Sequence, residues 1–203
     1  ALPGIGGPWE LFRDTNLGGT ENIIHACHHH GVQLLVYTSS PSATYAGEEQ
    51  CGVDESVGYD VDWLARHGAH YSRSKALAEQ AVLAANSAEG LQTCALRPHL
   101  IWAPRDQHLI PRLIARAKSG RLRRVGDGAN LVDMIYVENA ATAHLQAANA
   151  LSEENSAVAG NAYFLSQGEP VNCWEWIDDI LALADLPPVD KSISLPAAWR
   201  VGG

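Results

Sequence analysis

Two kinds of apolar pattern alternate along the first half of the chain. Residues 32–38 and 91–96 are short, nearly uninterrupted runs of aliphatic, β-branched and aromatic residues, which is typical of strands buried on both faces. Residues 8–30 and 69–87 instead carry apolar residues at helical spacing. The order helix, strand, helix, strand with long connections predicts an α/β fold around a parallel sheet.

The pattern changes in the second half, where elements are shorter and more mixed. It predicts a helix, a strand, an alanine-rich helix and a short strand over residues 108–119, 131–137, 137–151 and 163–166. Asn172 and Glu175 have the spacing of a capping box, which predicts that a further helix starts there. We expect one domain over residues 1–105 and a smaller α+β lobe over residues 106–203.

Composition narrows the class of protein. Of the 203 residues, 46% are hydrophobic and 18% are charged, as in ordinary globular proteins. The net charge of −9 argues against nucleic acid as a partner. No apolar run is long enough to span a membrane, and the four cysteines show neither close pairing nor zinc spacing. We therefore expect reduced cysteines, Cys27 and Cys94 in the core, and a cytoplasmic protein.

Tyr71 and Lys75 are the first candidates for chemistry. They lie four residues apart in a predicted helix, so their side chains leave the same face one turn apart. An ammonium beside a phenol favours the phenolate and would lower the tyrosine pKa from its usual value of about 10. Such a tyrosine can act as a general acid or base. The alternative for the pair alone is a surface contact without function.

A histidine cluster raises the question of a metal site. His25 and His28 to His30 lie at the end of the first predicted helix. Imidazoles are also favoured electrostatically at a helix C-terminus, and no carboxylate or cysteine lies near them in sequence. We expect no metal site.

Several sequence blocks together resemble the extended short-chain dehydrogenase/reductase family. They are Asn16-Leu17-Gly18-Gly19-Thr20-Glu21-Asn22, Tyr37-Thr38-Ser39-Ser40-Pro41-Ser42, Tyr71 to Lys75, and Ala95 to Pro104. The Thr38–Ser42 string and Gly168-Glu169-Pro170-Val171-Asn172 are most similar to its branch of 3β-hydroxysteroid dehydrogenases and sterol-4α-carboxylate 3-dehydrogenases. The resemblance covers nearly the whole chain and implies a Rossmann-like, doubly wound parallel sheet with a smaller substrate lobe.

The resemblance also implies roles for individual residues. Tyr71 would exchange a proton with the substrate oxygen, Lys75 would hold the cofactor ribose and lower the pKa of Tyr71, and Ser40 would orient the substrate. Ser39 is the neighbouring rival to Ser40. Pro98 and Ile101 would belong to the segment that runs past the nicotinamide. The implied cofactor is NAD, with NADP left open.

Two departures from the family pattern stand out. Trp102-Ala103 replaces the Tyr-Gly that the family prefers, so we expect a pocket wall of a different shape. No G-x-x-G-x-x-G turn for pyrophosphate follows a strand anywhere in the chain. The chain also lacks an initial Met and ends on Gly202-Gly203, so we expect a fragment that lacks the N-terminal glycine-rich part.

The sequence leaves three functions open. The first is an NAD(P)-dependent oxidoreductase that acts on the 3β-hydroxyl of a steroid or sterol. The second is a nucleotide-sugar epimerase or dehydratase of the same superfamily, and the third is a non-catalytic Rossmann-like binding protein. A small-molecule substrate is expected in the first two cases. A homodimer through the helices over residues 8–30 and 69–87 is a further expectation from the resemblance.

Overall fold

The computed structural model describes residues 2–3, 6–87 and 90–202, and the chain divides into two compact units. The first unit comprises residues 1–99 and 138–165, and the second comprises residues 100–137 and 166–203. The expected boundary after residue 105 thus falls inside the second unit. Residues 138–165 return to the first because their strand pairs with its sheet. Ala1 and Gly203, at the ends that suggested a fragment, lie outside the described residues.

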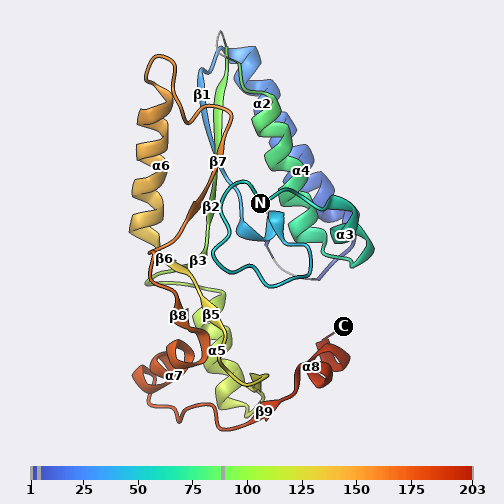
Figure 1. Cartoon of the computed structure of the whole chain (residues 1–203), viewed down its shortest axis with the longest axis vertical. Coiled ribbons are helices and arrows are strands. Elements are labelled where there is room, and N and C mark those ends of the chain that lie inside the picture. The colour runs from blue at the N-terminus through green and yellow to red at the C-terminus, as the bar shows by residue number, and fades with distance from the viewer. Residues whose placement is uncertain (1, 4–5, 88–89, 203) are drawn as a thin grey trace. The chain divides into compact units, whose positions relative to one another are not determined.

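A parallel sheet of three strands forms the centre of the first unit (Figure 1). Its order is β1 (Leu34–Thr38), β2 (Gln92–Pro98) and β7 (Ala162–Leu165). All but the first residue of the central strand β2 are buried, which explains its nearly continuous apolar sequence. The predicted α/β class and both predicted strands of the first half are confirmed, but the expected burial on both faces holds only for β2, because β1 is half-buried and ends on the exposed Thr38.

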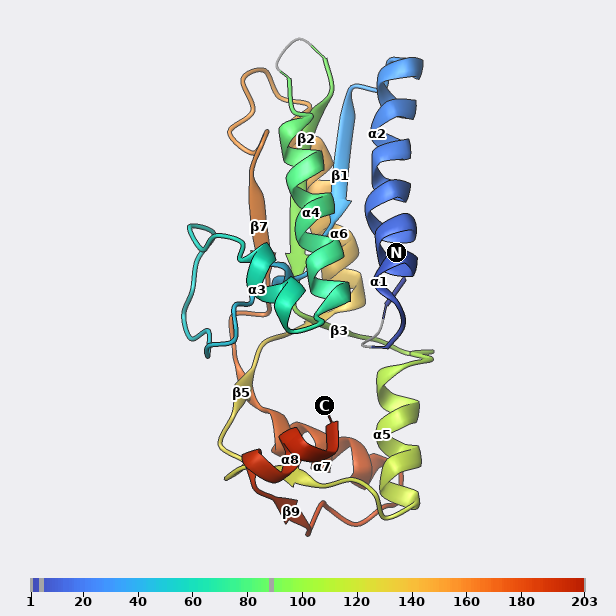
Figure 2. The same ribbon diagram turned by 90° about the vertical axis from the view of Figure 1, so that its right-hand side faces the viewer.

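Helices cover both faces of this sheet, with α2 and α4 in one layer and α6 in the other (Figures 1 and 2). Their bounds are α2 (Gly19–His30), α4 (His70–Ala84) and α6 (Val137–Leu151). The first predicted helix is continuous from Trp9 but changes geometry, because α1 (Trp9–Phe12) runs into a π-helical segment, η1 (Arg13–Gly18), before α2. Cys27 of α2 and Cys94 of β2 are both buried, as expected.

The long connection from β1 to α4 is more ordered than the sequence indicates. It contains a 3₁₀ helix, η2 (Pro41–Thr44), and a short helix, α3 (Val61–Arg66). The Asp60 carboxylate caps α3 by accepting a hydrogen bond from the Trp63 amide at 2.8 Å. Ala43 of η2 and Leu64 of α3 pack into one cluster with Ala76 of α4, so the connection has a small core of its own.

The second unit is a set of two-stranded sheets with packed helices. Its strand pairs are β3 (Leu100–Trp102) with β6 (Met134–Tyr136), β4 (Arg124–Val125) with β9 (Ser192–Ile193), and β5 (Leu131–Val132) with β8 (Val171–Asn172). Its helices are α5 (Leu109–Lys118), α7 (Cys173–Leu183) and α8 (Leu195–Gly202). The Asn172 side chain caps α7 as predicted. Within the described residues, no helix combines the length and the apolar character needed to cross a membrane.

Candidate active site

Helix α4 presents Tyr71 in its first turn and Lys75 one turn later, as the spacing predicts. Lys75 is buried and Tyr71 is half-buried. The Lys75 ammonium donates a hydrogen bond to the backbone carbonyl of Thr38 at 2.5 Å and lies 4.2 Å from the centre of the Tyr37 ring. The lysine therefore bridges from α4 to the last two residues of β1.

Ser40 lies just beyond the end of β1, where the chain turns into η2. Its backbone is extended, and its side-chain oxygen accepts a hydrogen bond from the Ser42 amide and is also hydrogen-bonded to the Ser42 hydroxyl at 2.9 Å. The Ser40 side chain also lies close enough to the Tyr71 phenol to lower its pKa. The structure thus brings together Ser40, Tyr71 and Lys75 at the carboxyl end of one strand, the edge at which open α/β sheets bind ligands.

Ser39 lies beside this group but in a different setting. It is buried, and its amide continues the sheet by donating to the Leu96 carbonyl at 2.6 Å. Its hydroxyl has no partner among the described residues. Between the two candidate serines, it is Ser40 that contacts the phenol.

The pKa of Tyr71 is not shifted in the expected direction. Burial raises it above its usual value, and the side chain of Ser40 opposes this only in part. Burial also lowers the pKa of Lys75 to about 8, against the attraction of Glu79. The expected lowering of the Tyr71 pKa by Lys75 is therefore wrong for this arrangement, because the ammonium is directed to the Thr38 carbonyl.

A buried ion pair behind Lys75 escaped the sequence analysis. Arg97 of β2 donates to Glu79 of α4 at 2.6 Å, and the side chains are 2% and 0% exposed. Tyr59, from the long connection, donates to Glu79 and accepts from Arg97 at 3.2 Å. Glu79 follows Lys75 by four residues on the same helix face, which was the available signal. The pair ties strand, helix and connection together beneath the site.

Asn16 makes a second unforeseen contact. It is buried in η1, and its amide donates to the Ser74 hydroxyl at 2.9 Å. Ser74 in turn donates to the Tyr71 carbonyl at 2.7 Å. Asn16 is the first residue of the motif that pointed to the family, but its role in holding the first turn of α4 depends on a contact 58 residues away in sequence.

Pro98 and Ile101 lie in different units. Pro98 is buried at the end of β2, in the first unit. Ile101 is in β3 of the second unit and is 40% exposed. Their expected contact with the nicotinamide stays a prediction.

A cavity of about 410 Å³ lies next to Lys75 in the first unit. It is lined by residues of η1, α2, β1 and α4, namely Thr15, Asn16, Gly19, Thr20, Ile23, Leu35, Val36, Tyr37, Thr38, Lys75 and Val82. Within the described residues, β1 is the outermost strand of the sheet on this side. The cavity gives a bound molecule direct access to Lys75 and Thr38.

The second unit has an apolar groove of about 730 Å³. Its lining includes Trp102, Ile110, Ile114, Tyr136, Trp176, Ile180 and Leu183, with Asp179 as its one charged residue.

The histidines at the end of α2 do not belong to a metal-binding group among the described residues. In the part of the chain that the structure describes, no group of three His, Cys, Asp or Glu side chains could hold a metal ion.

Comparison with protein families gives one family match. Residues 9–197 match the model of the 3-beta hydroxysteroid dehydrogenase/isomerase family. Relatives include a 2-alkyl-3-oxoalkanoate reductase of Stenotrophomonas maltophilia, 49% identical over 100% of this chain and 60% of its own length. A 3beta-hydroxysteroid-dehydrogenase/decarboxylase of Arabidopsis thaliana is 40% identical over 85% of this chain and 31% of its own length. The chain thus spans less than two thirds of the length of these relatives.

Comparison with solved structures supports the fold. A UDP-galactose 4-epimerase matches with a TM-score of 0.73 over 96% of this chain and 64% of its own. At 18% identity, this likeness establishes the Rossmann-like architecture and carries no information about the substrate.

Proposed function

The chain belongs to the 3-beta hydroxysteroid dehydrogenase/isomerase family, and on that premise we propose that it carries the catalytic part of an NAD(P)-dependent oxidoreductase. The reaction interconverts a secondary alcohol and a ketone. The observation that carries the proposal is the contact of Ser40 with the Tyr71 phenol, beside the buried Lys75. Hydroxyl, phenol and ammonium in one place suit proton exchange with a substrate oxygen.

The residues around Lys75 fit a nicotinamide cofactor. Lys75 lines the cavity beside β1 and its ammonium can bind ribose hydroxyls, and the buried Ser39 hydroxyl lacks a partner among the described residues. Lys75 would hold the ribose, and the backbone near Pro98 would border the ring. When bound, the cofactor supplies or accepts the hydride.

The chain's own groups handle the proton. Ser40 and Tyr71 both hydrogen-bond the substrate oxygen, and Tyr71 gives its proton to that oxygen as a carbonyl is reduced. Because burial raises the pKa of Tyr71, the phenol is protonated at neutral pH and suited to act as the acid. The Lys75 ammonium stays directed at the Thr38 carbonyl.

We propose a substrate with an oxygen on C3 of a large hydrocarbon framework. The first candidate is a 2-alkyl-3-oxoalkanoate, because the reductase with that name is 49% identical along this chain. The second is a 3β-hydroxysteroid or sterol, supported by the family match and by the 40% identical plant relative. The mainly aromatic and aliphatic lining of the groove in the second unit agrees with either hydrocarbon.

The test is steady-state oxidation of NADH and NADPH by the complete gene product. The substrates are a 2-alkyl-3-oxoalkanoate and a 3-oxosteroid. For the epimerase alternative, a UDP-sugar is incubated with NAD and its sugar products are separated, because epimerisation consumes no NADH. We expect the oxoalkanoate to turn over fastest and the UDP-sugar not to react. Conversion of the UDP-sugar alone would replace the proposal with an epimerase. Nucleotide binding without turnover of any ketone would favour the non-catalytic alternative.

A further inference from the structure

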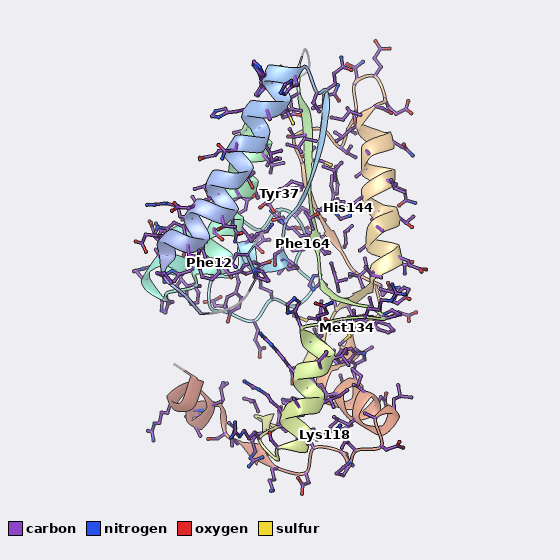
Figure 3. The ribbon with its side chains drawn as sticks, turned by 180° about the vertical axis from the view of Figure 1, so that it is seen from behind. Phe12, Tyr37, Lys118, Met134, His144 and Phe164 are labelled. Atoms are coloured by element: carbon purple, nitrogen blue, oxygen red, sulfur yellow. The ribbon has the colours of Figure 1, made fainter. Side chains whose placement is uncertain are left out.

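His144 reaches the site from the opposite side of the sheet. It lies on α6, and its Nε2 is 2.7 Å from the Thr38 hydroxyl at the end of β1. Figure 3 shows His144 on the α6 side of the sheet, while Tyr37, which precedes Thr38, faces the layer of α2 and α4. The two residues in contact are 106 positions apart in the chain.

The hydrogen bonds of the ring assign its proton. Nδ1 lies 2.7 Å from the backbone carbonyl of Ala140, which can only accept, so Nδ1 carries the hydrogen. In the neutral ring Nε2 is then an acceptor, and the Thr38 hydroxyl donates to it. Both ring nitrogens are satisfied, so the imidazole is held in one orientation against the strand end.

Thr38 is therefore held through two different groups. Its hydroxyl is bound by His144 from one layer, and its carbonyl accepts the Lys75 ammonium from the other. Thr38 is otherwise exposed at the edge strand, and Ser39 and Ser40 follow it directly.

From this geometry we infer that His144 is a positioning residue for Lys75 and acts through Thr38. By fixing Thr38, it fixes the direction of the carbonyl that anchors the ammonium. It also fixes the start of the segment that carries Ser40. The role in catalysis rests on the function proposed above, whereas the anchoring of Lys75 can be measured without any reaction.

The first experiment follows the titration of Lys75 in the complete gene product without nucleotide. Lysine side chains are labelled with ¹³C, and Lys75 is assigned by the signal lost in Lys75→Met. A carbonyl acceptor favours the charged ammonium, as does the Glu79 carboxylate, while the Tyr37 ring packs against it. We expect His144→Phe and Thr38→Val each to lower the measured Lys75 pKa by about half a unit.

Conservative variants separate positioning from packing. Gln in His144→Gln can still accept the Thr38 hydrogen, and Ser in Thr38→Ser can still donate it, so both should restore the wild-type titration. His25→Phe, an exposed histidine on α2, is the matched control. If His144→Phe fails to fold, Thr38→Val answers the question, because it keeps the shape of the side chain and removes only the hydroxyl.

The second experiment measures kcat and KM with the same variants. We expect His144→Phe and Thr38→Val each to lower kcat about tenfold. The double variant should lose little more than either single one, because both remove the same contact. Fully additive losses, or a Lys75 titration that stays at the wild-type value in both single variants, would overturn the inference. Absence of turnover with every substrate would instead refute the proposed function and leave the titration to decide the anchoring.

Discussion

Arg97 and Glu79 form an ion pair with an N–O distance of 2.6 Å in which neither side chain is more than 2% exposed. The pair joins the central strand β2 to helix α4 one turn beyond Lys75. Tyr59 completes it from the connection between β1 and α4. Burial and contact with Glu79 raise the pKa of Tyr59 to about 12, so the phenol stays neutral beside the carboxylate.

Arg97→Met is expected to destabilise the protein strongly. Removing one partner leaves the other charge buried and uncompensated, which costs about 3–5 kcal/mol. Tyr59→Phe removes only the phenol oxygen and should cost roughly 1 kcal/mol. Denaturant unfolding of both variants measures the change in the free energy of unfolding. An Arg97→Met loss below that of Tyr59→Phe would contradict the structural role of the pair.

Tyr71→Phe should remove the proton donor and keep the ring. We expect a loss in kcat of about 10²–10⁴-fold, with nucleotide affinity near that of the wild type. Tyr45→Phe is the matched control, because Tyr45 is 40% exposed in the connection and packs against Trp63. A Tyr71→Phe protein that keeps half of the wild-type kcat would exclude Tyr71 from the mechanism.

The two adjacent serines should differ in effect. Ser40→Ala removes the hydroxyl that contacts the phenol, so we expect kcat to fall by about 10-fold or more. Ser39→Ala removes a buried hydroxyl without a partner among the described residues. It should leave the titration of Tyr71 unchanged. If the pKa of Tyr71 shifts by the same amount in Ser40→Ala and Ser39→Ala, then Ser40 has no closer contact with the phenol than Ser39.

Lys75→Met should change the dependence of stability on pH. The lysine pKa is about 8 in the folded protein and 10.5 when unperturbed. Below pH 8 both states are protonated, and folding has to bury the charge. Between pH 8 and 10.5 only the unfolded state still holds the proton, so the stability of the wild type rises relative to the variant.

The measurement is the Tm of both proteins, without nucleotide, from pH 7 to pH 10.5. The variant should be the more stable protein at pH 7, by at most about 3 kcal/mol. The stability advantage of the variant should shrink steadily as the pH rises from about 8 to 10.5. Tyr37 and Tyr59 also have raised pKa values, but both proteins share them and the difference largely removes their effect. A constant difference in Tm would show that Lys75 is not held with a lowered pKa.

Local features of this protein could be predicted from its sequence. The spacing of Tyr71 and Lys75 places them on one face of α4, because helix geometry relates residues that are four apart. The strands β1 and β2 followed from apolar runs, and the start of α7 followed from Asn172 and its own amide partners. Each of these depends on neighbours within about one turn or one strand of the residue concerned.

The arrangement of the site was decided only by tertiary structure. Thr38 meets His144, and Asn16 meets Ser74, through the packing of helices on a sheet, which no short-range pattern encodes. The same packing explains why Lys75 binds a carbonyl and why the pKa of Tyr71 rises. Sequence spacing can place two groups on one face, but burial and the direction of each hydrogen bond set their charges, and both come from residues distant in the chain.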